Sequence, residues 1–154
     1  MMNVQSLMAF VLTICCPVLV LGQTSVKDQI RNTVADMYPG YTVDETEKES
    51  WCHGESLLEV EIEMEEEGQE QEMKLLFTTT GRIRYREEGI QPADLPGVVV
   101  KAFRAACPDC GDPREADKLT ALDGGENVYE VEGRKGLREY AIIIRENGEF
   151  LCRL

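Results

Sequence analysis

LLEVEIEME, residues 57–65, alternates strictly between apolar and acidic side chains. Its apolar positions include Leu58, Val60, Ile62 and Met64, and glutamates stand at 59, 61, 63 and 65. Successive side chains of a β-strand point to opposite faces, so a period of two predicts a strand with one buried and one solvated face. Such strands are typical of antiparallel sheets. The acidic face predicts a solvated surface or a recognition surface for a cationic protein.

The residues around this strand extend it into an antiparallel meander. EEGQE predicts a turn, QEMKLLFT a second strand, TTG a tight turn and RIRYR a third strand. The side chains expected on the apolar face are Met73, Leu75, Phe77, Ile83 and Tyr85. Ahead of the meander, SVKDQIRNTVADMYPG predicts a helix and YTVDETEKES one more strand. The helical spacing is carried by Val26, Ile30, Val34 and Met37.

The second half of the chain repeats this order. ADLPGVVVKAFRAACP matches the first helix, READKLTAL the short strand and NVYEVEG the Glu-Val-Glu strand, while REYAIIIRENGEFLCRL matches the last two strands. The inward positions expected here are Tyr129, Val131, Tyr140, Ile142, Ile144, Phe150 and Cys152. The sequence therefore predicts an α+β protein of two tandem repeats, residues 23–90 and 91–154, each a helix packed on a four-stranded antiparallel sheet.

The second repeat resembles the PepSY-like domains related to the β-lactamase-inhibitor fold. The resemblance lies in ADLPGVVVKAFRAACP, READKL, the NVYEVE strand and REYAIIIRENGEFL, and the first repeat matches more loosely. It implies a small exported module, generally non-enzymatic, that binds a protein or peptide and in some relatives inhibits an enzyme. The resemblance brings no catalytic motif to this chain.

The N-terminus and the charge predict where the protein works. Residues 7–21 are apolar throughout, which is shorter than the roughly 20 residues that span a bilayer as a helix. Residues 1–22 therefore predict a signal peptide cleaved before Gln23, a secreted or periplasmic protein, and no stable membrane span after cleavage. The formal net charge of −13 excludes nucleic acid as a partner, because phosphates would be repelled.

Four cysteines follow the predicted signal peptide, and they are the candidates for disulfides in an exported protein. They are Cys52, Cys107, Cys110 and Cys152, and the sequence leaves all three complete pairings open. The alternative is a small exported metal-binding protein in which Cys107 and Cys110 join Cys52, His53 or Cys152 as ligands. Cys107 ends a predicted helix, where the helix dipole disfavours a thiolate, so redox catalysis is not expected.

Nothing in the sequence assembles a catalytic site. His53 is the only histidine, and no nucleophile with a partnering base, phosphate loop or calcium loop accompanies it. We therefore predict a non-enzymatic exported module without a cofactor, which holds a protein or peptide partner through its sheet surface or its loops, or acts as an inhibitor.

Overall fold

The computed structural model describes residues 24–154 apart from residue 67, so the predicted signal peptide lies outside the described residues. Its helices are α1 (Val26–Met37) and α2 (Gly97–Ala106), with short 3-10 turns η1 (Cys52–Gly54) and η2 (Pro92–Asp94). The strands are β1 (Thr42–Ser50), β2 (Ser56–Glu66), β3 (Gln69–Thr78), β4 (Ile83–Ile90), β5 (Glu115–Ala121), β6 (Val128–Lys135), β7 (Arg138–Arg145) and β8 (Phe150–Arg153). Within the described residues no helix is long and apolar enough to cross a membrane.

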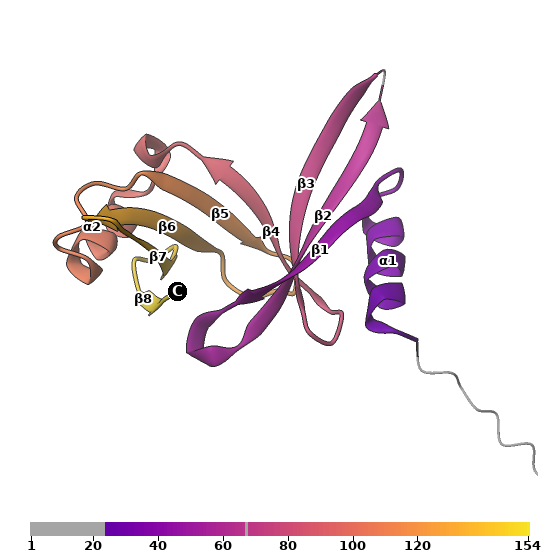
Figure 1. Ribbon diagram of the computed structural model, residues 1–154, viewed down its shortest axis with the longest axis horizontal. Coiled ribbons are helices and arrows are strands. Elements are labelled where there is room, and N and C mark those ends of the chain that lie inside the picture. The colour runs from indigo at the N-terminus through magenta and orange to yellow at the C-terminus, as the bar shows by residue number, and fades with distance from the viewer. Residues whose placement is uncertain (1–23, 67) are drawn as a thin grey trace, which may run out of the picture.

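All eight strands form a single antiparallel sheet in the order β1 to β8 (Figure 1). The predicted architecture of two repeats with separate four-stranded sheets is therefore wrong. The two halves join where β4 pairs with β5, from Tyr85 opposite Ala121 to Ile90 opposite Ala116. A free sheet edge leaves a row of backbone N–H and C=O groups unpaired, and this pairing removes two such edges. The side-chain pattern predicted the strands but carried no information on which edges would meet.

Both helices cover the same face of the sheet, which we call the outer face. Ser25 caps α1 by accepting a hydrogen bond from the Asp28 N–H, and the helix buries Ile30 and Val34. The sheet residues buried beneath α1 are Val60, Ile62, Leu75 and Phe77. Beneath α2, which buries Val99 and Phe103, the corresponding residues are Ala116, Tyr129, Val131, Ile142 and Ile144. These sheet positions confirm most of the apolar alternation predicted for the strands.

The opposite face, here the inner face, carries a third buried cluster that the alternation did not predict. This inner apolar cluster consists of Trp51, Cys52, Leu57, Leu76, Tyr85, Leu119, Val128 and Ile143. Two register shifts move side chains onto this face. One lies in the β3–β4 pairing and places Tyr85 opposite Leu76, and the other lies in the β7–β8 pairing and places Cys152 opposite Ile143. The expectation that Tyr85 and Cys152 share the helix-covered face is thus wrong. Phe150 was also expected to be an inward position, but its side chain is 48% exposed.

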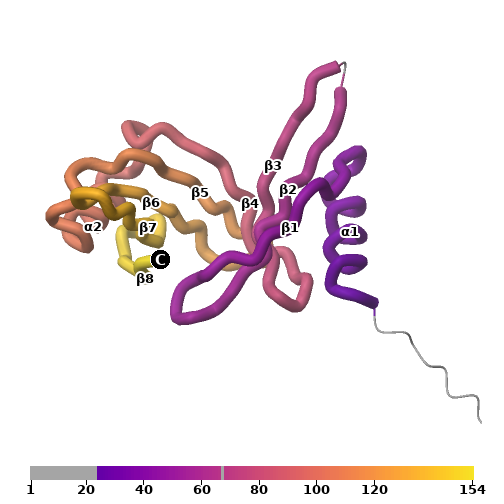
Figure 2. The backbone as a smooth tube through the Cα atoms, viewed as in Figure 1, coloured from indigo at the N-terminus to yellow at the C-terminus, as the bar shows by residue number. Residues whose placement is uncertain are grey.

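The sheet is strongly bent. β3 and β4 pair only as far as Lys74 opposite Glu87, and the rest of the β2–β3 hairpin rises away from β4 (Figure 2). On the other side, β5 to β8 form a second arm, and β8 returns to contact η1. The middle of the sheet is consequently buried on both faces, which explains the continuous apolar runs at residues 75–77 and 142–144.

Candidate functional site

Next to the inner apolar cluster, the inner face carries charged side chains. β-strand alternation places each of them two residues along its strand from a member of that cluster: Glu59 follows Leu57, for example, and Asp117 precedes Leu119. The charged positions are Glu59 on β2, Lys74 on β3, Glu87 on β4, Asp117 on β5 and Glu130 on β6. Glu49 on β1 faces the same side, because it pairs with Leu57. We call Glu49, Glu59, Glu87, Asp117 and Glu130 the inner carboxylate cluster.

Lys74 forms the cluster's internal ion pair. Its Nζ lies 2.8 Å from Oε1 of Glu59, whose side chain is 17% exposed. The hydrogen bond to Glu59 raises the pKa of Lys74. One ammonium group beside five carboxylates leaves the cluster strongly negative when all of them are ionised.

The remaining carboxyl groups hold their protons more tightly than usual. Burial, followed by the charges of Asp117 and Glu59, raises the pKa of Glu87 to about 7. Burial, followed by the charges of Glu87 and Asp117, raises the pKa of Glu130 to about 7. Burial raises the pKa of Asp117 as well. Such shifts reflect the cost of bringing several anions into a partly dehydrated space.

The bend of the sheet brings these groups together from distant strands. In a flat sheet β1 and β6 would be about 24 Å apart, since neighbouring strands lie about 4.8 Å apart. Salt would then screen one charge from the other almost completely. Yet the charge of Glu49 contributes to the raised pKa of both Glu87 and Glu130, after burial and nearer carboxylates. The inner carboxylate cluster is therefore a convergent set rather than a line of surface charges.

A hollow of about 500 Å³ opens beside the cluster, where β3 and β4 separate. Its lining residues are Glu61, Glu72, Met73, Lys74, Arg86, Glu87, Glu88 and Gly89. This volume suits a side chain or a small ligand. Its carboxylates can accept hydrogen bonds from ammonium or guanidinium groups, the contact that Lys74 already makes with Glu59. Among the described residues no group of three or more histidine, cysteine, aspartate or glutamate side chains is arranged to hold a metal ion.

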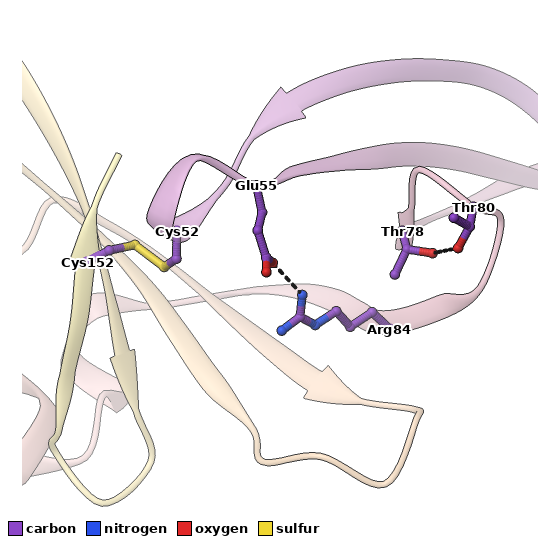
Figure 3. A network of polar contacts seen from close by, with 6 residues as sticks. All are labelled: Cys52, Glu55, Thr78, Thr80, Arg84 and Cys152. Atoms are coloured by element: carbon purple, nitrogen blue, oxygen red, sulfur yellow. Dashed lines mark hydrogen bonds and ion pairs between the residues drawn. A yellow bond between two sulfur atoms is a disulfide. The ribbon is translucent and has the colours of Figure 1, made fainter.

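The four candidate cysteines form two disulfides in the structure. Cys52 is joined to Cys152 on the inner face, and Cys107 is joined to Cys110 in the turn after α2, within the cluster on the outer face (Figure 3 shows the first pair). The two pairs belong to different buried clusters on opposite faces of the sheet. The structure therefore does not bring Cys107 and Cys110 together with the Cys52, His53 or Cys152 side chains that the metal-binding alternative requires.

His53 lies beside the first disulfide, at the rim of a second hollow of about 490 Å³. It has a left-handed backbone conformation, with φ at 59°, in the turn that carries Cys52. In the same hollow Arg84 donates a hydrogen bond from Nη1 to Oε2 of Glu55 over 3.2 Å (Figure 3). The Arg84 guanidinium also stacks over the ring of Tyr85. This end of the inner face is thus made of paired charges over aromatic rings, unlike the carboxylate end.

Sequence patterns identified only part of the inner carboxylate cluster. Glu59 belongs to the alternating stretch, whereas Glu87, Asp117 and Glu130 were not singled out, because their convergence depends on the β4–β5 pairing and on the bend. A usable signal was present in the second half. Glu130 lies between Tyr129 and Val131, which are expected to face the helix, so the pattern places Glu130 on the opposite face. The pattern does not show which carboxylates of other strands share that face.

Comparison of the sequence with protein-family models and with curated proteins finds no match. Among solved structures, the fold is similar to that of a DUF2874 family protein from Bacteroides uniformis, at 16% identity and a TM-score of 0.49. It is also similar to a structure from Bacteroides eggerthii described as "putative periplasmic proteins", at 16% identity and a TM-score of 0.50. Each likeness covers 82% of this chain and 86% of the other. At this identity the likeness to the second structure concerns the fold alone.

Proposed function

We propose that this protein is an exported, non-enzymatic binding module, of the PepSY-like kind that its sequence resembles, which holds a cationic segment of a protein or peptide on its inner face. The observation that carries the proposal is the arrangement of the inner carboxylate cluster on one face: Glu87 lies opposite Lys74, and Asp117 lies opposite Glu130. Burial and the neighbouring carboxylates raise the pKa of Glu87 and Glu130 to about 7. Carboxylates that repel one another are costly to bring together. A bound cation would relieve that repulsion, so the cluster is organised for a partner that supplies positive charge.

The chemistry of the partner follows from the groups present. Lys74 already occupies one carboxylate, and the hollow beside it offers further acceptors to a lysine or arginine side chain. The net charge of −13 adds a long-range attraction for cationic molecules, which raises association rates at low salt. A binding module needs only a preorganised surface, so this function requires no reactive side chain.

Export is part of the same proposal. The apolar N-terminus is typical of a signal peptide, and one structure of similar fold is described as periplasmic in the words given above. Disulfides such as Cys52–Cys152 persist in oxidising spaces outside the cytosol. The partner would then be another exported protein or a peptide in the same space.

The direct test is binding of a lysine- and arginine-rich peptide to the chain that starts at Gln23, measured by calorimetry at about 20 and about 200 mM salt. We expect affinity that falls with salt, and a loss of about tenfold or more in Glu87→Gln/Glu130→Gln. The matched control is Asp36→Asn/Asp94→Asn, which removes two exposed carboxylates elsewhere. Equal losses in both double variants, or no binding of the basic peptide, would contradict the proposal.

A further inference from the structure

The Cys52–Cys152 disulfide joins the two ends of the sheet. Cys52 lies in η1, directly after edge strand β1, and Cys152 lies in β8, the opposite edge strand. In a flat sheet of eight strands these edges would be about 34 Å apart. Their Cα atoms are 5.5 Å apart across 100 residues of sequence. The bridge therefore closes the bend of the sheet across its inner face.

The other contacts of β8 tie it mainly to its own half of the molecule. β8 has four residues and pairs with β7 through a shifted register. Arg153 donates from Nη2 to the carbonyl oxygen of Ala106 over 2.6 Å and stacks on Tyr140, both in the second half. Across the inner face, β8 reaches η1 through the disulfide and through the packing of Leu151 on the inner apolar cluster. The disulfide is thus the covalent bond that joins the two ends of the sheet, beside the packing of the inner apolar cluster.

This closure also positions the candidate binding site. Glu49 precedes Cys52 by three residues on the same segment, so the disulfide holds the end of β1 in place. Glu130 lies on β6 in the arm that ends with Cys152. The disulfide therefore links the segment that carries Glu49 to the arm that carries Glu130.

The second disulfide provides an internal contrast. Cys107 and Cys110 are three residues apart, both are buried, and they span one turn after α2. Breaking that bridge would release a local turn and no contact between the ends of the sheet. Cys152, in comparison, is partly exposed on an edge strand, while Cys52 is 5% exposed and borders the 490 Å³ hollow.

We propose that Cys52–Cys152 is a redox latch that controls the inner carboxylate cluster: the oxidised protein holds the cluster together, and reduction by a dithiol opens it. A thiolate of the dithiol attacks Sγ of Cys152, a mixed disulfide forms, and Cys52 leaves as a thiolate that takes up a proton. The second thiol of the reductant then displaces Cys152. Two electrons pass from the dithiol to the Cys52–Cys152 disulfide. The dithiol becomes a disulfide, and Cys52 and Cys152 both end as thiols.

The latch is tested in Cys107→Ala/Cys110→Ala, where Cys52–Cys152 is the disulfide that remains among the described cysteines. Hydrogen exchange and the emission of Trp51, the sole tryptophan, are compared before and after a dithiol reductant. We expect faster exchange confined to η1 and β8, red-shifted Trp51 emission, and a lower pKa of Glu130 in a carboxyl-carbon NMR titration. Cys52→Ser/Cys152→Ser should reproduce the reduced form.

Two results would overturn the latch. One is unchanged exchange and emission on reduction, and the other is loss of protection throughout α1, α2 and β6, which would make the bridge a general staple of the fold. The effect on binding rests on the proposed function: basic-peptide affinity should fall about tenfold on reduction. If the oxidised and the reduced protein bind the basic peptide equally, the latch is contradicted and the proposed function is not. If the oxidised protein does not bind the peptide, the proposed function is contradicted, and the hydrogen-exchange result then decides whether the latch exists.

Discussion

Gly133 on β6 shows how one residue sets the distance between α2 and the sheet. A Cβ atom at this position would lie against the ring of Phe103 and 3.1 Å from Cβ of Cys110. Both neighbours are buried, so neither can move aside into solvent. Glycine is needed here for close approach of the helix rather than for an unusual backbone angle.

We therefore predict that Gly133→Ala lowers the free energy of unfolding by about 1–3 kcal/mol, because overpacking a buried contact forces side chains or backbone to shift. Chemical denaturation of the purified variant measures the change. The control is Gly97→Ala at the start of α2, where an added Cβ meets nothing within 4 Å. An equal effect at both positions would show that the loss does not come from the contact with Phe103.

Across strands, the raised carboxyl pKa values predict an unusual dependence of stability on pH. Unfolding returns Glu130 from a pKa of about 7 to an ordinary value near 4.3, so the folded state binds more protons between these values. The free energy of unfolding should therefore fall as the pH rises from about 5 to about 8. Glu87, whose pKa is also about 7, contributes in the same direction.

Glu130→Gln removes one of these charges and provides the test. We expect the variant to be more stable than the original chain above pH 7, on the order of 1–2 kcal/mol, and closer to it near pH 5. Thermal or chemical unfolding at a series of pH values measures the free energy of unfolding of the variant and of the original chain. Glu65→Gln, at an exposed position near the hairpin end, is the control and should leave the slope unchanged. A wild-type curve that rises between pH 5 and pH 8 would contradict the assignment.

For the whole molecule, the continuous sheet predicts one cooperative unit. β4 and β5 share six residue pairs, and the inner apolar cluster takes Leu57 and Leu76 from one half and Leu119 and Ile143 from the other. Two separate repeats would unfold independently, whereas a shared sheet and cluster couple the halves.

Unfolding in denaturant should accordingly give coincident transitions by Trp51 fluorescence, which reports on the inner apolar cluster, and by far-ultraviolet circular dichroism, which reports on the entire sheet. Fragments 23–90 and 91–154 made separately should not fold, because each exposes a long strand edge and half of the cluster. A fragment with a cooperative transition of its own would argue for independent halves.

The elements themselves were predictable from the sequence because their signals are local. Side-chain periodicity indicates the helix around Ile30 and Val34 and the strand around Val60 and Ile62. This periodicity reflects backbone geometry over a few residues. The same holds for the turn glycines Gly81 and Gly148, both at positive φ. These signals predicted the kinds of element and their order along the chain.

The architecture and the site depend on contacts between distant segments. Period-two patterning cannot show that β4 pairs with β5, that a register shift turns Tyr85 to the inner face, or that Asp117 lies opposite Glu130. Each depends on edge pairing, bulges and sheet bending, whose free energies come from residues far apart in sequence. The sequence alone thus established the acidity of the chain, its amphipathic strands and helices and their order. The folded sheet established one continuous sheet with three buried clusters and a set of carboxylates on its inner face, because strand edges and charges find their partners only in three dimensions.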